Sequence, residues 1–505
     1  MALARQAAAL NRPTTPWDVK GKRTFLIGIG GSGMAGMARM LAARGAVVRG
    51  SDSTRQETTD ALAAAGIAVS LDQSGPLPPD TELVVASAAI KPDHPQLAEA
   101  VRRGIPHFSY AQALGRCMLG RTAVCIAGTH GKSTTTAMLS CVLAEAGLDP
   151  TAILGATCRQ LGGATPGPAA GFRLGSATIG TGPWAGKPGL LLAESCEFNR
   201  SFHNYHPTIG VVTAVEADHL DIYGTLDAVI ESFAEFARRI APAEEGGLLL
   251  IAHDNAHRRE VAAGIAARVQ TIGFNPAADW SVKHEPATRV TTLIGPDKRV
   301  VCQWQTAMPG EHNAMNAATA AALAAVLGAP PAVITRALSA FAGLDRRTQL
   351  LGQWRAASWP TGQGVRVYDD YGHHPTEVEV TLKALRQAEA PEKRSGRLVC
   401  VFQPHQHSRT RHLMEEFASA FSAADLVIVP HIYFVRDSEE EKTKVTAGDL
   451  VDRLRHKGVH AMHLYPFEAI VEHLQTALRP GDLLVVMGAG PVNQVAHALL
   501  KTTHA

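Results

Sequence analysis

The stretch "AGTHGKSTTT" (127–136) places a lysine after a glycine and before four hydroxyl residues. An apolar run, "AVCIAG" (123–128), precedes it, and an Ala/Leu-rich stretch of helical period follows. A strand that turns through glycines into a helix directs backbone N–H groups and the positive end of the helix dipole to the point where Lys132 adds a charge. The pattern therefore predicts a cradle for nucleoside triphosphate, and this strand–loop–helix context disfavours a tight turn with an incidental lysine.

The hydroxyl residues after the lysine suit a metal ion. Ser133 or Thr134 would supply a hydroxyl to Mg²⁺, because a hard cation beside phosphate oxygens takes oxygen ligands. The glycine spacing is shorter than in the widespread G-x-x-x-x-G-K-[ST] loop, since only two residues separate Gly128 from Gly131.

The same alternation of apolar runs and Ala/Leu-rich stretches occurs along the whole chain and restarts twice. It is typical of buried parallel strands joined by crossover helices. At 505 residues, the chain is also too long for a single core. We therefore expect three α/β domains with joints near 118 and 345. The predicted parts are a flexible tail at 1–21, a Rossmann-like domain at 22–117, a central P-loop-type ATPase domain with a mostly parallel sheet at 118–345, and a second Rossmann-like domain at 346–505.

Most of the expected strands end in Gly, Ser, Asp or Pro. They are predicted at 24–30, 46–52, 82–90, 123–128, 189–195, 209–219, 247–254, 269–274, 365–372, 398–404, 425–430 and 482–490. A Gly/Pro/Thr-rich stretch at 162–188 indicates an irregular loop or a hairpin. The longest charge run, "RDSEEEKTK" (436–444), is interpreted as a solvated loop or helix face.

The composition excludes several function classes. With 46% hydrophobic residues, 19% charged residues and a formal charge of +2, the chain lacks the basic excess that favours nucleic acid or membrane surfaces. No apolar run approaches the roughly 18 residues needed to span a bilayer. The seven cysteines form no C-x-x-C pair, which is consistent with a reducing cytoplasm.

A second glycine-rich turn, "GIGGSGMAG" (28–36), follows the first predicted strand. In a nicotinamide-cofactor domain, Gly28, Gly30 and Gly33 would hold a pyrophosphate and Asp52 would hold a ribose hydroxyl. The same geometry suits any nucleotide diphosphate, including a UDP-linked substrate. Because the chain already carries a triphosphate loop, the first domain is a candidate site for the second substrate.

Acidic and histidine-rich segments follow strands of the two later domains. Glu194 lies in "LLLAESCE" and His219 in "TAVEADHLD", at strand ends where ligands gather in an open parallel sheet. Both could reach a metal held over the phosphate loop. The third domain adds "DDYGHHPTE" (369–377) and "FQPHQHSRTR" (402–411), and the joint contributes arginines at 346–347.

Taken in order, these motifs resemble those of the Mur ligases, the ATP-dependent amide-forming enzymes of peptidoglycan precursor synthesis. The resemblance covers nearly all of 22–500 and is closest to the branch that adds L-alanine. The stretches that carry it are "GIGGSGM", "SAAIKPDHP", "GTHGKSTTT", "EADHLDIY", "EHNAMNAATA", "YDDYGHHPTEV" and "FQPHQHSRTR".

The resemblance implies a reaction and its partners. The first domain would bind UDP-N-acetylmuramic acid, the second ATP with Mg²⁺ or substituting Mn²⁺, and the third the amino acid, L-alanine. The substrate carboxylate would attack the γ-phosphorus to give an acyl phosphate, and the amine would then displace phosphate. The implied protein is a cytoplasmic monomer or weak homodimer without nucleic-acid partners or membrane insertion.

The resemblance also implies residue roles. The implied catalytic residues are Lys132, Glu194, His219 and Arg347. ATP would be bound by Gly128, Thr129, His130, Gly131, Lys132, Ser133, Thr134, Asn313, Arg347 and Asp370, with His312 and Asn316 near the adenine. The UDP substrate would be bound by Gly28, Gly30, Gly31, Gly33, Met34, Asp52, Ser87 and His130. The amino acid would face Tyr371, His373 and Arg409, and the metal would be held by Ser133, Glu194 and His219.

Three features depart from the family pattern. Ala214 stands where an asparagine is usual, so an amide near the metal is missing. Gln406 stands where a second arginine is usual, and bidentate carboxylate recognition is specific to arginine. No lysine occurs between 188 and 282, consistent with the alanine-adding branch, which lacks a carbamoylated lysine.

These departures leave alternatives open. One is a ligase of the same architecture that adds another amino acid or a recycled peptide. Another is a nicotinamide oxidoreductase, although hydride transfer gives Lys132 no task. A third is a non-catalytic nucleotide-binding regulator. The base that takes the amine proton also stays open among three histidines, His219, His373 and His374.

Overall fold

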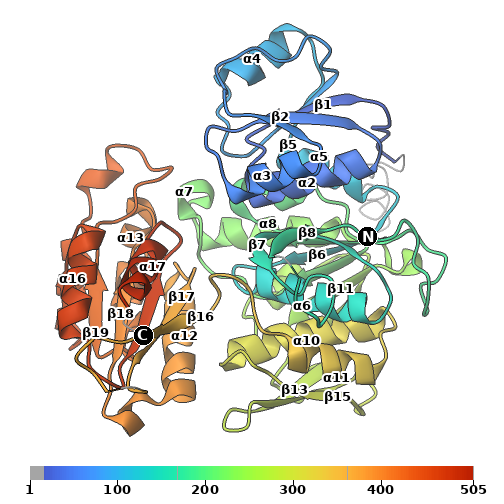
Figure 1. The fold of residues 1–505 in the computed structure, drawn as a ribbon. Helices are drawn as coiled ribbons and strands as arrows, with labels where there is room; N and C mark the ends of the chain where they lie inside the picture. The colour runs from blue at the N-terminus through green and yellow to red at the C-terminus, as the bar shows by residue number, and fades with distance from the viewer. Residues whose placement is uncertain (1–15, 168, 361, 504–505) are drawn as a thin grey trace.

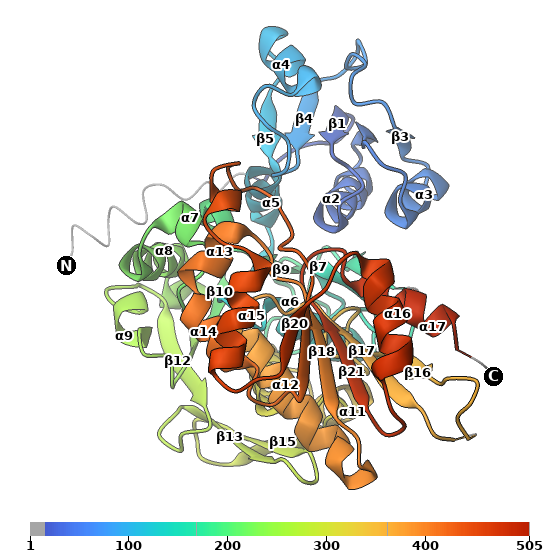
Figure 2. The same cartoon turned by 90° about the vertical axis from the view of Figure 1, so that its left-hand side faces the viewer.

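The chain folds around three sheets, of five, ten and six strands. The structure, a computed structural model, describes residues 16–167, 169–360 and 362–503. Figures 1 and 2 show three bodies in chain order, the first in blue, the second in green to yellow and the third in orange to red. This arrangement confirms the predicted three-domain α/β class.

The predicted tail lies mainly outside the described residues, which begin at Pro16. The remaining part of it, 16–21, packs on the first domain. Val19 is buried, and the Trp17 ring meets the Phe108 ring edge-on at 5.5 Å.

The first sheet is entirely parallel, in the order β3-β2-β1-β4-β5. Its strands are β1 Arg23–Ile27, β2 Val47–Ser51, β3 Ala68–Ser70, β4 Leu83–Ala86 and β5 His107–Ser109. Its helices are α2 Ser32–Ala43, α3 Glu57–Ala64, α4 Pro95–Arg102 and α5 Tyr110–Met118. The methionines of α2 are buried and belong to the core between this domain and the next.

The middle sheet has the order β15-β14-β13-β12-β11-β10-β6-β9-β7-β8 and is parallel from β13 to β7. Its parallel strands are β6 Thr122–Ala127, β7 Thr151–Cys158, β9 Leu190–Ser195, β10 Ile209–Val212, β11 Leu248–Ala252, β12 Arg268–Gly273 and β13 Trp280–Glu285. Antiparallel partners at the edges are β8 Ala170–Arg173, β14 Val290–Ile294 and β15 Val300–Gln305. Its helices are α6 Lys132–Glu145, α7 Leu220–Tyr223, α8 Leu226–Arg238, α9 Arg258–Val261, α10 Glu311–Val326 and α11 Pro331–Ala340.

Strand β6 is buried along its whole length, which explains its unbroken apolar sequence. It leads directly into α6, and α10 packs against α6 through a run of alanines. Small side chains allow the two helices to approach closely, so the phosphate loop between β6 and α6 is held on a rigid base.

The third sheet has the order β16-β17-β21-β18-β19-β20, with only β16 antiparallel. Its strands are β16 Gln349–Trp354, β17 Val365–Asp370, β18 Leu398–Phe402, β19 Leu426–Val429, β20 Ala461–His463 and β21 Leu483–Met487. Its helices are α12 Pro375–Glu389, α13 His407–His412, α14 Met414–Ala420, α15 Ala447–His456, α16 Phe467–Ala477 and α17 Asn493–Lys501. Among the described residues, no helix combines the length and apolarity that a membrane crossing requires.

Candidate functional site

A cavity of about 510 Å³ lies where the three domains meet. Its walls come from residues 129–134, 155–157, 194, 196–198 and 218–219 of the middle domain, and from 345–347, 371, 373, 377, 405, 406, 409, 436 and 489 of the third. Ser32, at the start of α2, is the one described first-domain residue that lines it. The structure thus brings most of the predicted catalytic, metal and amino-acid residues into one space.

The phosphate loop has the backbone that its glycines predict. Gly128 and Gly131 have φ angles of 135° and 82°, which L side chains rarely adopt. A Cβ on Gly131 would also lie 2.4 Å from the side-chain oxygen of Asn316 on α10. The glycines are therefore needed both for the turn and for the close packing of the loop on α10.

Lys132 is held by the loop and by one carboxylate. Its Nζ donates to the carbonyl of Gly128 at 2.5 Å and to Oε2 of Glu197 at 3.0 Å. Burial lowers the pKa of Lys132, but attraction to Glu197 outweighs burial and raises it overall, so the lysine is charged. Sequence reasoning missed Glu197, although it ends the acidic segment that contains Glu194.

Two oxygen-bearing groups meet beside this lysine. Ser133 Oγ donates to Oε1 of Glu194 at 2.9 Å, and the amide of Gly155 donates to Oε2 of the same carboxylate at 2.8 Å. Hydroxyl and carboxylate oxygens are ligands that Mg²⁺ prefers. These two residues therefore fit the metal role predicted for them.

The third predicted metal ligand, His219, lies in a cluster with two carboxylates. Its ring nitrogen and carboxylate oxygens of Glu197 and Asp218 lie within 4.8 Å of one another. Burial lowers the pKa of His219 to about 3, which keeps the imidazole neutral and able to coordinate a cation. Neither carboxylate was predicted, and both are already paired with cations, Glu197 with Lys132 and Asp218 with Arg409.

A smaller cavity of about 230 Å³ adjoins the phosphate loop and is lined by six of the ten residues predicted to bind ATP. It is lined by His130, Gly131, Thr134, His312, Asn313, Asn316, Arg347 and Asp370. Ala214 also lines this cavity and is absent from the described lining of the cavity that contains Glu194. The carbonyl of Ala214 accepts a hydrogen bond from the amide of Thr129 at 2.9 Å, so position 214 lies directly beside the phosphate loop.

The carboxylate of Asp370 is bound by backbone. It accepts hydrogen bonds from the amides of Thr348 at 2.6 Å and Gly372 at 2.7 Å. In this structure Asp370 fixes the linker between the two domains as well as lining the predicted ribose side of the nucleotide cavity.

The linker directs one arginine toward both cavities. Arg347 lies between Arg346 and Thr348, which have φ angles of 59° and 48°. Its guanidinium lies 3.7 Å from Oε1 of Glu377 and 5.0 Å from the centre of the Tyr371 ring. This position at the boundary of the cavities suits the predicted contact with a terminal phosphate.

Tyr371 and His373, two of the residues predicted to face the amino-acid substrate, line the cavity of about 510 Å³. Their ring centres are 5.5 Å apart. Burial lowers the pKa of His373 to about 4, so its imidazole is neutral. His374 lines a different cavity, and its Nε2 lies 3.2 Å from the carbonyl oxygen of Ala217.

Arg409 pairs with a carboxylate of the middle domain, and its predicted contact with the amino acid stays a prediction. Its guanidinium lines the same cavity but donates to Oδ1 of Asp218 at 2.8 and 3.0 Å, and so joins the third domain to the middle one. Both side chains are almost fully buried. Its charge is thus already matched by a carboxylate of the protein.

The residues predicted for the UDP substrate form the first-domain turn. Gly28 has a φ of 76°, and Gly31, Gly33 and Met34 lie at the start of α2 or just before it. Ser87 packs directly against Gly28, because a Cβ on this glycine would lie 3.0 Å from that of the serine.

Asp52 supports the backbone of this turn. Its Oδ2 accepts from the amide of Gly30 at 2.8 Å, and its Oδ1 accepts from that of Thr54 at 3.2 Å. Its predicted contact with the ligand stays a prediction.

His130, predicted to contact both ATP and the UDP substrate, sits between two carboxylates. Its ring nitrogens lie 3.4 Å from Glu216 and 3.2 Å from Glu377, which lies in the first turn of α12 in the third domain. Burial lowers the pKa of His130, but these carboxylates outweigh burial and raise it to about 9. Two neighbouring histidines, His312 and His374, have lowered pKa values and are neutral.

The contact between His130 and Glu377 is expected to weaken at alkaline pH. A raised folded-state pKa gives a stabilisation that is complete below the ordinary value of about 6.5 and is lost as pH rises through about 9. We expect the radius of gyration, measured by small-angle X-ray scattering, to increase between about pH 8 and 10. A His130→Gln variant should lack this pH dependence, and an identical profile in both proteins would contradict the prediction.

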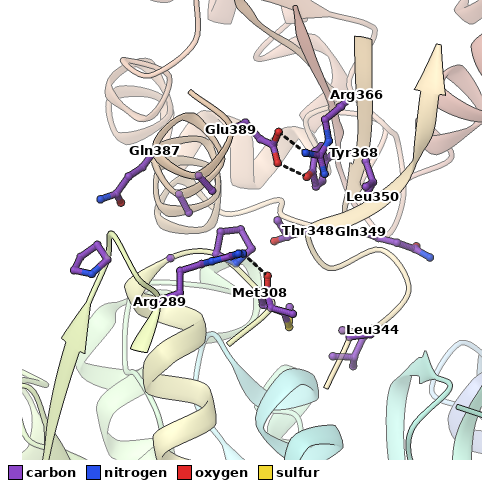
Figure 3. A pocket seen from close by; sticks show the side chains of 18 of the residues that line it. Arg289, Met308, Leu344, Thr348, Gln349, Leu350, Arg366, Tyr368, Gln387 and Glu389 are labelled. Atoms are coloured by element: carbon purple, nitrogen blue, oxygen red, sulfur yellow. Dashed lines mark hydrogen bonds and ion pairs between the residues drawn. The ribbon is translucent and has the colours of Figure 1, made fainter. Parts of the chain in front are cut away.

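A third cavity, of about 930 Å³, lies beside the linker, between the middle and third domains. Figure 3 shows Arg366 and Tyr368 directed at Glu389, and Arg289 approaching from the middle domain. Tyr368 donates to Glu389 at 2.7 Å, and Arg366 pairs with it at 2.9 Å, so these groups satisfy one another. None of the predicted site residues lines this cavity, although it shares Asp345 and Thr348 with the two cavities of the candidate active site.

The comparisons with known proteins agree with this architecture. Three family models match: "Mur ligase family, catalytic domain" over 25–122, "Mur ligase middle domain" over 190–324, and "Mur ligase, glutamate ligase domain" over 346–490. Among solved structures, the UDP-N-acetylmuramate-alanine ligase of Thermotoga maritima has a TM-score of 0.73 at 22% identity, covering 95% of this chain and 98% of that one. A murein peptide ligase from Psychrobacter arcticus has a TM-score of 0.68 at 23% identity, covering 96% and 100%.

Curated relatives are more similar in sequence. The UDP-N-acetylmuramate–L-alanine ligase of Kineococcus radiotolerans is 38% identical, over 95% of this chain and 96% of that protein. A protein of the same name from Thermobifida fusca is 36% identical, over 98% and 99%. Because this similarity extends over nearly the full length of both proteins, the chain belongs to the Mur ligase family.

Proposed function

We propose that this chain joins L-alanine to the lactyl carboxylate of UDP-N-acetylmuramic acid, with ATP converted to ADP and phosphate, in peptidoglycan precursor synthesis. Residues 22–117 bind the UDP sugar, 118–345 bind ATP, and 346–505 bind the amino acid. The enzyme acts in the cytoplasm as a monomer or weak homodimer.

One observation carries this proposal. Lys132 on the phosphate loop, the Ser133–Glu194 pair and Arg347 on the linker all face the cavity that Tyr371 and His373 also line. Phosphoryl transfer depends mainly on positioning and on neutralising charge on the phosphoryl oxygens. A lysine, an arginine and a metal-binding pair around one space are suited to that task.

The reaction proceeds in two displacements. The lactyl carboxylate attacks the γ-phosphorus, the bond to the β-phosphate oxygen breaks, and ADP leaves. Lys132 and Arg347 neutralise charge on the transferring group, and Ser133 and Glu194 would hold Mg²⁺, which would supply further neutralisation there. The amine then attacks the acyl carbonyl, the bond from that carbon to the phosphate oxygen breaks, inorganic phosphate leaves, and the proton lost by the amine passes to a base or to the phosphate as the amide forms. Closure of the three domains around the substrates would limit the access of water, which would otherwise hydrolyse the acyl phosphate.

A nicotinamide oxidoreductase receives no support from the first domain. Asp52, the residue that would hold the ribose in that reading, supports the backbone of its own turn.

The test is amine-dependent ADP release. With UDP-N-acetylmuramic acid, ATP and Mg²⁺, we expect L-alanine to stimulate ADP formation and to yield one coupled product per ADP, measured by mass spectrometry. A chelator should abolish the reaction, and added Mg²⁺ or Mn²⁺ should restore it. Stronger stimulation by glycine, L-serine or a peptide that begins with L-alanine would overturn the amino-acid assignment. No stimulation by any amine would overturn the ligase assignment.

A further inference from the structure

The candidate active-site cavity of about 510 Å³ is lined by five Lys or Arg side chains among its described residues. Four of them form ion pairs with carboxylates. The matched pairs are Lys132 with Glu197 at 3.0 Å, Arg346 with Asp369 at 3.4 Å, Arg347 with Glu377 at 3.7 Å and Arg409 with Asp218 at 2.8 Å. The fifth, Arg436, has no carboxylate partner within the described part of the chain. An amino acid entering the cavity therefore meets one cation that is not already neutralised.

The fold directs Arg436 into this cavity. The next residue, Asp437, accepts a hydrogen bond from Ser408 Oγ at 2.6 Å and from the backbone amide of His407 at the start of α13. The Arg436 guanidinium lies 4.5 Å from the centre of the Phe198 ring in the middle domain. The Asp437 hydrogen bonds hold the backbone next to Arg436, and the Phe198 ring holds its guanidinium. Together they place this exposed guanidinium at the joint between the domains.

This placement corrects the interpretation of the charge run at 436–444. Its later residues, from 438 onward, are largely exposed, as expected of a solvated loop. Its first two residues belong to the site, because Asp437 anchors the loop to α13 and Arg436 faces the cavity.

Gln406, which stands where the family pattern has an arginine, lies in the same wall. It is 2% exposed, has a left-handed φ of 68° and lines the cavity. Its side-chain Nε2 is buried and has no hydrogen-bond partner among the described residues. A buried donor without a partner is costly, which indicates a polar group that a ligand would satisfy.

We propose that Arg436 binds the carboxylate of the incoming amino acid and supplies the guanidinium that position 406 lacks, with the Gln406 amide as a second donor. This inference rests on the proposed function. Arg409 holds Asp218 across the domain joint and is thereby unable to offer a full charge to the substrate. A planar guanidinium with no anionic partner matches a carboxylate in shape and charge.

The test separates the amino-acid carboxylate from the rest of the reaction. For Arg436→Gln we expect the KM for L-alanine to rise about 10- to 100-fold, as for loss of a charged hydrogen bond, while the KM for ATP changes less than about twofold. The wild-type enzyme should prefer L-alanine over L-alaninamide, which lacks the carboxylate. Arg436→Gln should lose most of this preference, and Arg436→Lys should keep an intermediate part of it.

The matched control is Lys444→Gln, which removes one positive charge from the same loop at an exposed ion pair. It should leave every KM unchanged. If Arg436→Gln keeps the wild-type KM for L-alanine and the wild-type preference over L-alaninamide, this inference fails and the proposed function stands. If no amine stimulates the wild-type enzyme, the proposed function fails and this inference fails with it.

Discussion

Replacing Lys132 with alanine is expected to lower the rate of ADP release by at least about 10³-fold while the fold is retained. The lysine is charged, is held in place by the Gly128 carbonyl and is the cation of the phosphate loop itself. Within the described residues 128–136, His130 is the one other basic residue. Phosphate or ADP release at more than about a tenth of the wild-type rate would contradict the prediction.

The same substitution leaves Glu197 buried without its partner. Burial already raises the pKa of this carboxyl, so we expect it to take up a proton and not to unfold the domain. The double variant Lys132→Ala/Glu197→Gln should therefore melt close to Lys132→Ala and be equally inactive. Lys187→Ala, on an exposed loop of the same domain, is the matched control and should retain full activity.

Asp218→Asn is expected to open the molecule between its middle and third domains. It would leave Arg409 buried beside a neutral amide, and breaking a buried ion pair in this way costs about 3–5 kcal/mol. Because the two residues belong to different domains, rotation at the linker can hydrate Arg409 without unfolding either core. We therefore expect a larger radius of gyration in small-angle scattering and a fall in kcat/KM of about 100-fold or more.

The control for this variant is Asp227→Asn, which removes an exposed carboxylate from the first turn of α8. It should change neither the scattering nor the rate. A variant at 218 with wild-type scattering and wild-type kcat/KM would show that the ion pair does not hold the domains together.

The parts that could be predicted from the sequence are local ones. The phosphate loop was found because strand, glycines, Lys132 and helix are contiguous, and the structure builds them as one turn. Long buried strands such as β6 and β21 were found because burial on both faces makes their sequences uniformly apolar. The carboxyl ends of these strands then indicated where a site would lie.

Other strands were missed for physical reasons. β3, β5 and β20 have three residues each, too few to show a period. β7 and β16 each contain a glycine and are partly exposed, so their patterns are weak.

The missed site residues depend on contacts between distant segments. Arg409 and Asp218 are 191 residues apart, and nothing local indicates that one neutralises the other. Arg436 was hidden in a charge run whose other members are mostly solvated. Glu197 lies three residues beyond a predicted metal ligand, and its role depends on the fold that turns it toward Lys132.

The linker itself bears on how the enzyme releases its product. Arg346 and Thr348 both hold left-handed torsions, which cost non-glycine residues about 1–2 kcal/mol each and are least favourable for a β-branched side chain. Rotation of the third domain can relax these torsions. We therefore expect backbone strain in the linker to favour the open arrangement of the domains, from which the finished amide leaves. The polar contacts between the middle and third domains have to offset this strain each time the domains close.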